Sequence, residues 1–155
     1  EFAKIDTECK LINVGQPRGS SYEECHELLK SADMIKKVKF TGIVSYEDLP
    51  RYYADADVVV VASEIYESFS YTVAQAMACG KPVIASRIGG IPETLDFGRL
   101  GFLFEPGDKN SLMDMLSYVY NNQVKDISEH AHDYAVNKFS FEKLGAIYNN
   151  YYMRQ

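Results

Sequence analysis

Two polar residues eight positions apart, Glu67 and Gln75, flank a segment whose residue types suit an oxygen-rich ligand. The segment follows four consecutive valines, Val58 to Val61, and places Ser68 and Ser70 just before an expected helix. The first turn of a helix leaves backbone N–H groups unpaired and carries a partial positive charge, so it favours a phosphate. Side chains as small as serine let the backbone approach such a ligand closely.

The spacing of Glu67 and Gln75 fits a nucleotide sugar. If most of the span between them is helical, it rises about 12 Å, which is roughly the reach of a diphosphate flanked by two sugars. Carboxylate and amide oxygens accept hydrogen bonds from hydroxyl groups, and a vicinal diol offers two donors. We therefore expect Glu67 on one sugar, the helix N-terminus on the diphosphate and Gln75 on the ribose. On this pattern alone, an ordinary surface glutamate is the simpler interpretation of Glu67.

The elements that must position this segment alternate between apolar runs and amphipathic stretches. We expect strands in the ranges 10–15, 38–42, 58–61, 81–86 and 101–108. We expect helices over 21–32, from 48 onward, over 71–79, from 108 onward and over 141–152. This alternation predicts an α/β fold with a doubly wound parallel sheet, whose ligands bind beyond the carboxyl ends of the strands. Because Val58 to Val61 form a continuous apolar run, we expect their strand at the centre of the sheet.

Composition limits the classes of function. The 155 residues are 46% hydrophobic and 25% charged, as in globular proteins, and we predict a single domain over 1–155. The net charge of −6, without a cluster of Lys and Arg, argues against nucleic-acid binding. The longest apolar run, Val58 to Ala62, is far shorter than the roughly 20 residues of a membrane-spanning helix. Cys9, Cys25 and Cys79 form no CxxC pair, so we interpret them as buried thiols of a reducing compartment.

The string ESFSYTVAQAMACGKPVIASRIGGIPETLDFGRLGFLFEPGD resembles the retaining glycosyltransferases of family 4, which have the GT-B fold. Their pattern runs from Glu through a Gly/Ser-Phe-Gly/Ser triplet to a second acidic position, then through AMA-x-G-x-PVIAS, GG-x-PE and G-x-L-x-x-PGD. The upstream string VKFTGIVSYEDLPRYYADADVVVVAS resembles the family as well. The resemblance covers nearly all of the chain from Leu11 onward and is specific, because many spaced elements recur in order.

The resemblance implies a role for each matching residue. Glu67 matches the first acid of the family's E-x7-E element, which holds hydroxyls of the transferred sugar near the reacting carbon. The triplet that lies against that sugar is Ser68, Phe69 and Ser70, and the diphosphate contacts are Tyr71 and Thr72. The nucleobase contacts are Gly42, Val44 and Tyr46. Gln75 departs from the family, where Glu is normal, so we expect a ribose hydrogen bond without a charge and weaker donor binding.

The family's mechanism implies a metal-independent reaction without a cofactor. We interpret Asp55-Ala56-Asp57 as a helix end and a strand entry, not as an Asp-x-Asp metal motif. Glu93, in the GG-x-PE turn, is interpreted as a structural cap, with ligand contact as the alternative. The histidines match no family site and are expected to be exposed on helices: His26, His130 and His132.

The resemblance further implies that this chain is the donor-binding, C-terminal domain of a larger enzyme. Its last helix would cross back to an absent N-terminal domain. The stripe along one side of that helix would serve core or interface packing, and it consists of Phe141, Leu144, Tyr148 and Tyr152. The donor-clasping Arg and Lys, the acceptor site and the family's N-terminal histidine are missing. We therefore expect the chain alone to hold a donor weakly and to transfer nothing measurable.

For the full-length protein we expect transfer of a hexose or N-acetylhexosamine from a nucleoside diphosphate sugar, with uridine diphosphate (UDP) favoured. The acceptor would be a glycan or a lipid-linked glycan of bacterial surface polysaccharide, such as O-antigen or capsule. The enzyme would be cytoplasmic, with any membrane association supplied by the missing part. Two alternatives stay open, namely a sugar-nucleotide epimerase of the same architecture and a non-catalytic nucleotide-sugar-binding module. The sequence leaves the base, the sugar and the acceptor open.

Overall fold

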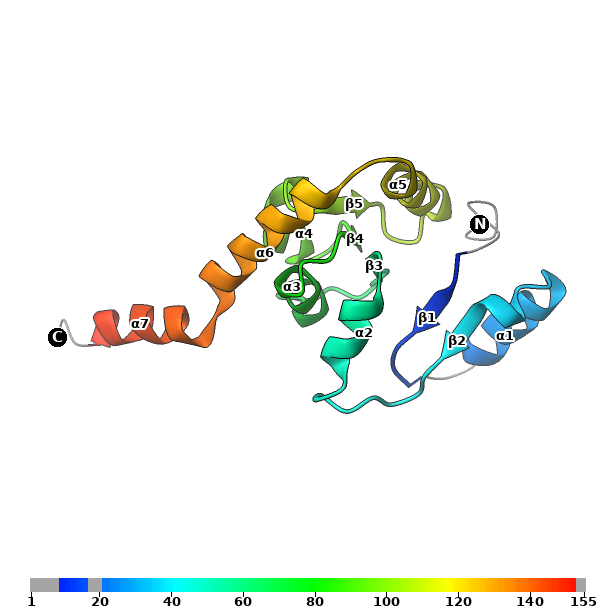
Figure 1. Ribbon diagram of the computed structural model, residues 1–155, viewed down its shortest axis with the longest axis horizontal. Coiled ribbons are helices and arrows are strands. Elements are labelled where there is room, and N and C mark those ends of the chain that lie inside the picture. The colour runs from blue at the N-terminus through cyan, green and yellow to red at the C-terminus, as the bar shows by residue number, and fades with distance from the viewer. Residues whose placement is uncertain (1–8, 17–20, 153–155) are drawn as a thin grey trace. The chain divides into compact units, whose positions relative to one another are not determined.

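The computed structural model describes residues 9–16 and 21–152, and the chain forms two compact units (Figure 1). The first unit comprises Glu1–Tyr52 and the second Tyr53–Gln155. The assignment of 1–155 to a single donor domain stays a prediction.

The first unit is built on two parallel strands. Its elements are β1 (Leu11–Asn13), α1 (Ser21–Ser31), the short 3₁₀ helix η2 (Ile35–Lys37), β2 (Val38–Phe40) and the start of α2 (Leu49–Asp55). Strand β1 pairs with β2 so that Leu11 lies opposite Val38. Just beyond the strands, Gly15 donates its N–H to the carbonyl of Gly42 at 3.2 Å. Both glycines have positive φ, 130° and 70°, which is the conformation that favours glycine.

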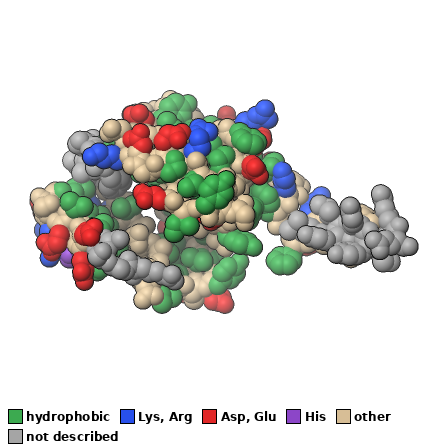
Figure 2. All heavy atoms as spheres, turned by 180° about the vertical axis from the view of Figure 1, so that it is seen from behind, with side chains coloured by type: hydrophobic (Ala, Val, Ile, Leu, Met, Phe, Trp, Pro, Cys, Tyr) green, Lys and Arg blue, Asp and Glu red, His purple; other side chains and the backbone are tan. Residues whose placement is uncertain are grey.

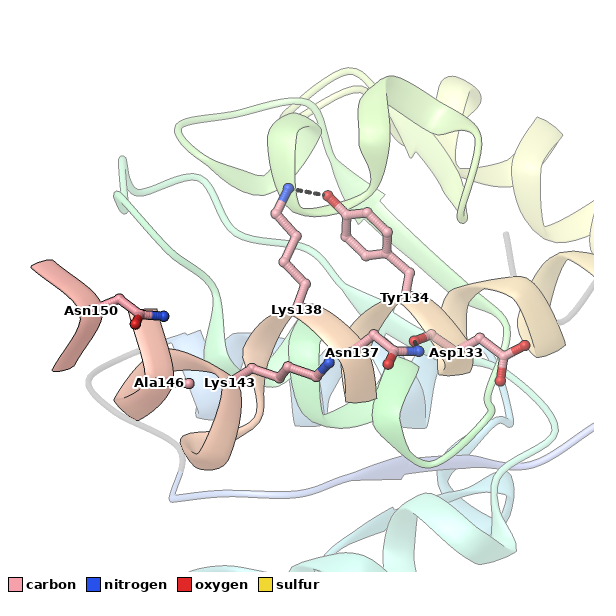
Figure 3. A pocket seen from close by; sticks show the side chains of 7 residues that line it. All are labelled: Asp133, Tyr134, Asn137, Lys138, Lys143, Ala146 and Asn150. Carbon is pink, nitrogen blue, oxygen red and sulfur yellow. Dashed lines mark hydrogen bonds between the residues drawn. The ribbon is translucent and has the colours of Figure 1, made fainter. Parts of the chain in front are cut away.

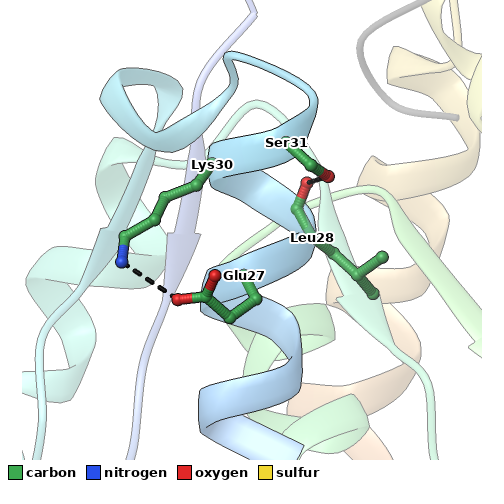
Figure 4. A network of polar contacts seen from close by, with 4 residues as sticks. All are labelled: Glu27, Leu28, Lys30 and Ser31. Atoms are coloured by element: carbon green, nitrogen blue, oxygen red, sulfur yellow. Dashed lines mark hydrogen bonds and ion pairs between the residues drawn. The ribbon is translucent and has the colours of Figure 1, made fainter.

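Local contacts on α1 explain how this surface helix ends (Figure 4). Lys30 Nζ lies 3.0 Å from Glu27 Oε1, and the Ser31 hydroxyl donates to the Leu28 carbonyl at 2.8 Å. The Leu28 carbonyl also accepts the N–H of Ala32 at 3.1 Å, so the hydroxyl adds a second hydrogen bond to it in the last turn. The ion pair is solvent-exposed and contributes at most about 1 kcal/mol.

The second unit is a three-stranded parallel sheet with helices between and after its strands. Its strands are β3 (Val59–Val61), β4 (Val83–Ser86) and β5 (Phe102–Phe104), in the order β3-β4-β5. Its helices are α3 (Tyr71–Ala78), α4 (Ile91–Thr94), η3 (Asp96–Gly98), α5 (Lys109–Asn121), α6 (Lys125–Phe139) and α7 (Phe141–Tyr152). All five predicted strands are present and both sheets are parallel, which confirms the α/β class.

The core of the second unit lies between β4 and α3, and α6 covers α3. All four residues of β4 are buried, as are Val73, Ala76 and Met77 of α3. Ala131 and Ala135, both small, are buried on α6 and let that helix lie close to α3. Together these side chains fix the direction of α3, whose N-terminus is part of the predicted site.

Two predictions about burial are wrong. Val58 to Val61 were expected at the centre of a sheet, but in this unit's sheet β3 lies at an edge, β4 is central, and only Val61 of β3 is buried. Cys25 and Cys79 are exposed and Cys9 is only half-buried, so none of the three is a buried thiol. Cys25 lies on α1, none of whose described side chains is buried, and Cys79 caps α3 just past its buried face.

Several predicted helix boundaries are confirmed. Asp55 ends α2, two residues before the strand-entry Asp57, and Asp108 caps α5 by accepting the N–H groups of Asn110 and Ser111 at 2.8 and 3.2 Å. Helix α7 spans 141–152 as expected. Phe141 is exposed, while the other side chains of the predicted stripe lie outside the described residues: Leu144, Tyr148 and Tyr152.

The surface agrees with the charge analysis. On the face shown in Figure 2, Lys and Arg side chains stand apart from one another, and hydrophobic side chains reach the surface in several places. None of the helices in the described ranges is both long and apolar enough to cross a membrane.

Candidate functional site

The loop from β3 to α3 packs against the two glycines of the GG-x-PE turn, Gly89 and Gly90. Gly90 donates its N–H to the carbonyl of Glu67 at 2.8 Å. A Cβ at Gly89 would lie 2.2 Å from that carbonyl oxygen, and one at Gly90 would lie 2.0 Å from the carbonyl oxygen of Ser68. Neither distance is sterically possible, so both positions require glycine. The turn therefore fixes the backbone of the segment that carries the predicted site.

Gly90 is itself anchored to α4, of which it is the N-cap residue. Its carbonyl accepts a hydrogen bond from the Thr94 hydroxyl at 2.9 Å, and Thr94 is buried. Glu93, interpreted as a structural cap, lies exposed in the first turn of α4, where a carboxylate interacts favourably with the helix dipole. The whole turn is thus tied into the fold on one side and to the Glu67 loop on the other.

The Glu67 carboxylate is oriented by a serine that the sequence analysis did not single out. Ser63 donates its hydroxyl to Glu67 Oε1 at 3.1 Å, and both residues are half-buried. Ser63 lies two residues past the end of β3, so the carboxylate stands at the carboxyl edge of the parallel strands, as predicted. In the sequence, Ser63 is simply a hydroxyl residue four positions before Glu67. Such a spacing predicts a contact only within a helix, and these two residues lie in a loop.

The side chains of the triplet from Ser68 to Ser70 differ in their burial. Ser68 is exposed, Ser70 is buried, and Phe69 is half-buried. The Phe69 ring packs edge-to-face against Phe139 of α6, with ring centroids 5.2 Å apart, and against Tyr71 at 5.3 Å. The Phe69 ring therefore serves packing within the second unit.

The N-terminus of α3 has the features of an anion-binding end. Ser70 is the N-cap residue in extended conformation, and its carbonyl accepts the N–H of Ala74 at 3.1 Å. Its side chain makes no capping hydrogen bond, so it does not occupy the N–H groups of the first turn. Tyr71 and Thr72, the predicted diphosphate contacts, are both exposed in that turn.

Gln75 lies one turn further along α3 and is half-buried. Its Oε1 accepts a hydrogen bond from the Tyr53 hydroxyl at 3.0 Å. Sequence reasoning missed this partner, because it lies 22 positions earlier on another helix.

The predicted nucleobase residues all belong to the first unit. Gly42 has a φ of 70° and lies two residues past the end of β2. Val44 is half-buried, and Tyr46 is 74% exposed. Tyr46 sits in a tight turn that is closed by hydrogen bonds between Ser45 and Asp48, from hydroxyl to Oδ2 at 2.8 Å and from Asp48 N–H to hydroxyl at 3.2 Å. Their contact with a base stays a prediction.

A separate groove of about 560 Å³ lies between α6 and α7 (Figure 3). It is lined by Asp133, Tyr134, Asn137, Lys138, Lys143, Ala146 and Asn150. Lys138 donates to the Tyr134 hydroxyl and lies 4.8 Å from the centroid of that ring. This hydrogen bond raises the pKa of Lys138. None of the predicted ligand residues lines the groove. Within the described ranges, no group of three or more His, Cys, Asp and Glu side chains is arranged to hold a metal ion.

Comparison with known proteins identifies the family. Residues 1–122 match the family described as glycosyl transferases group 1. The chain belongs to the group 1 glycosyltransferases. Its fold matches the C-terminal, Rossmann-like domains of GT-B glycosyltransferases.

Relatives of this glycosyltransferase chain are longer proteins. It is 32% identical over 155 residues to N-acetyl-alpha-D-glucosaminyl L-malate synthase of Bacillus anthracis, covering 97% of this chain and 39% of that protein. It is 32% identical over 151 residues to lipopolysaccharide 1,2-N-acetylglucosaminetransferase of Salmonella typhimurium, covering 93% and 40%. The crystal structure of Anabaena HepE with UDP and glucose superposes with a TM-score of 0.88 at 26% identity, covering 99% of this chain and 43% of HepE. The chain thus spans about two fifths of each of these three proteins.

Proposed function

We propose that this chain is the donor-binding part of a retaining glycosyltransferase that takes a hexose or N-acetylhexosamine from a nucleoside diphosphate sugar. The observation that carries the proposal is the fixed position of Glu67 just before the N-terminus of α3. Ser63 holds its carboxylate and the glycine turn holds its backbone. The side chain of the N-cap residue, Ser70, makes no capping hydrogen bond, so it leaves the N–H groups of the first turn free for a ligand. An acid that accepts hydroxyl hydrogen bonds next to free N–H donors suits a sugar attached to a diphosphate.

The proposed mechanism assigns each group a separate part of the donor. Glu67 holds hydroxyls of the transferred sugar, and the backbone of the triplet from Ser68 to Ser70 lies against it. As the bond to the nucleoside diphosphate breaks, negative charge grows on the leaving oxygen. The fixed N–H groups of Tyr71 and Thr72 stabilise that charge without reorganising, which lowers the barrier. Gln75 contacts the ribose, and Gly42, Val44 and Tyr46 contact the base.

The reaction as proposed uses no metal ion or other cofactor. The remaining charge on the leaving diphosphate is met by an Arg and a Lys that the family resemblance places upstream of Leu11. The acceptor site belongs to a second domain of the complete protein, and the last helix, α7, connects back to it. Coverage of about two fifths of the relatives supports this division, with 39% and 40% of the two bacterial enzymes matched.

A UDP-sugar is the proposed donor. Support comes from HepE, whose crystal structure contains UDP and glucose, and from the N-acetylglucosaminyl enzymes of Bacillus and Salmonella. The Salmonella relative acts on lipopolysaccharide, which supports a glycan or lipid-linked acceptor of a bacterial surface polysaccharide. We further propose that the enzyme works in the cytoplasm.

One observation favours a second candidate, a non-catalytic nucleotide-sugar-binding module. Gln75 stands where the family normally has Glu, and a lost charge at this position weakens donor binding. The two candidates differ in turnover, not in ligand.

The deciding experiment uses the complete protein. A thermal-shift screen of UDP-glucose, UDP-N-acetylglucosamine, GDP-mannose and ADP-glucose should raise the melting temperature most with a UDP-sugar, since a ligand that binds only the folded state stabilises it. Transfer of the labelled sugar to a glycan acceptor, with the anomeric configuration of the product read by NMR, then tests catalysis and retention. Binding without transfer would favour the non-catalytic module, and an inverted product would contradict retention. No stabilisation by any nucleotide sugar would overturn the proposal as a whole.

A further inference from the structure

The hydrogen bond between Tyr53 and Gln75 fixes the side chain of the proposed ribose contact. The Tyr53 ring, at the end of α2, packs against the hydrophobic core, so its hydroxyl has a defined position. The last turn of α2 is held further by Lys81, which donates to the carbonyl of Ala54 at 2.7 Å. From this support the Tyr53 hydroxyl reaches Gln75 Oε1 at 3.0 Å in a half-buried setting.

A carboxamide has two chemically different ends, and this bond sets which way each of them faces. Oε1 accepts the tyrosine proton and keeps a second lone pair, while the two N–H groups of Nε2 have no hydrogen-bond partner among the described residues. A glutamate at the same position could only accept, because an ionised carboxylate has no proton to give. Compared with glutamate, Gln75 therefore adds two hydrogen-bond donors at this position as well as removing the charge.

We propose that Tyr53 is a positioning residue that holds the Gln75 amide so that this subsite donates a hydrogen bond to a ribose hydroxyl oxygen. The inference rests on the proposed function, since it assigns a polarity to the ribose contact of that same site. It predicts that the protein recognises the ribose by its lone pairs, whereas relatives with glutamate recognise its hydroxyl protons.

A double-mutant cycle in the complete protein tests the link between the two residues. Tyr53→Phe removes only the hydroxyl, and one neutral hydrogen bond corresponds to a change of about 2- to 12-fold. We expect it to raise the KM for the UDP-sugar within that range while kcat changes less than about twofold, because the contact is equal in ground and transition states. In a Gln75→Ala background the same change should alter KM less than about twofold. Tyr52→Phe, on the same helix, is the control and should leave KM unchanged.

An equal effect of Tyr53→Phe in both backgrounds would show that the hydroxyl serves the fold alone, and would overturn the proposal. A structural role also predicts that KM and thermal stability change together in every variant, so melting temperatures are measured alongside.

Fluorinated ligands test the polarity of the subsite. Fluorine in place of the 2′ or 3′ hydroxyl of UDP accepts a hydrogen bond weakly and cannot donate one. The wild-type protein should therefore lose less than about 10-fold in affinity for at least one analogue, measured by calorimetry. Gln75→Glu, which needs a hydroxyl proton for a charged hydrogen bond, should lose more than about 10-fold with the same analogue. Equal losses in the two proteins would mean that the amide oxygen faces the ligand, and would overturn the inference.

Failure of this inference is distinguishable from failure of the proposed function. If the wild-type protein binds UDP and transfers sugar but the cycle is additive, only the role of Tyr53 is wrong. If the wild-type protein binds neither UDP nor a UDP-sugar, both proposals are overturned.

Discussion

The backbone nitrogen of Gly90 lies 2.8 Å from the carbonyl oxygen of Glu67 and donates its N–H to it. The turn after β4 is therefore bonded to the loop after β3. Strands β3 and β4 are adjacent and parallel, and their carboxyl ends meet at this point. A Cβ at position 90 would approach Ser68 O to 2.0 Å. The main chain of Glu67 is thus held by the backbone of the glycine turn, which lies directly against it.

Gly90→Ala should therefore damage the site more than the fold. Crowding of this kind typically costs about 1–3 kcal/mol, and here the backbone that must move carries Glu67 and Ser68. We expect kcat/KM for sugar transfer to fall at least about 10-fold, beyond what the drop in melting temperature explains, because small displacements of positioning groups are costly. Gly145→Ala is the control, since nothing lies within 4 Å of a Cβ there. Unchanged activity in Gly90→Ala would contradict the role given to the turn.

Ser63→Ala should weaken catalysis through Glu67. The hydroxyl donates to the carboxylate at 3.1 Å, and a hydrogen bond to a charged group is worth about 1.5–3 kcal/mol when desolvated. Because Ser63 is only half-buried, we expect a smaller effect, a fall in kcat/KM of about 5- to 10-fold. Ser63→Thr keeps the hydroxyl and should retain most activity, and Ser117→Ala, a half-buried serine on α5, should have none of this effect. Equal losses in the alanine and threonine variants would point to packing instead.

Phe139→Leu should link stability to donor binding. The Phe139 ring pairs with Phe69 at 5.2 Å and with Tyr134 at 5.8 Å, and such pairs contribute about 0.5–1.5 kcal/mol each. Losing them should lower the melting temperature and raise the donor KM about threefold or more, because Phe69 belongs to the triplet that we propose to lie against the sugar. Phe102→Leu is the matched control, since its ring pairs with Tyr118 at 5.6 Å elsewhere in the same unit. It should lower stability without changing KM. A KM change of equal size in both variants would exclude a specific role for Phe139.

Most of the fold was predictable because short apolar runs end at glycine or proline. Helix α6 was not predicted as an element, although its histidines were expected on a helix. Its buried residues are Ser128, Ala131 and Ala135, which have helical spacing but are too small to stand out as an apolar face. The central strand was misassigned because the sequences of β3 and β4 are both continuously apolar or small. Only the order of strands in the sheet decides which of the two strands has a neighbour on each side.

The site was predictable where its residues are neighbours in sequence. Glu67, the triplet and the start of α3 follow one another, so their grouping needs only a strand, a loop and a helix. The partners that orient them are distant: Gly90 lies 23 positions after Glu67, and Tyr53 lies 22 before Gln75. No local pattern encodes such contacts, since they depend on which strands and helices are adjacent in the folded protein.

Glu67→Ala is the most direct test of the proposed chemistry. Removing the carboxylate leaves the sugar without its main positioning group, and loss of orientation alone can cost about 100-fold in rate. We expect turnover of the complete protein to fall at least that much, whereas Glu64→Gln, an exposed glutamate of the same loop, should stay within about twofold of wild type. Glu67→Gln should be intermediate, because the amide still accepts a hydrogen bond but carries no charge. The measurement is steady-state transfer from a UDP-sugar, with melting temperatures to exclude unfolding. Near-normal turnover in Glu67→Ala would show that the donor sugar is held elsewhere, and the role of the carboxyl edge of β3 would have to be abandoned.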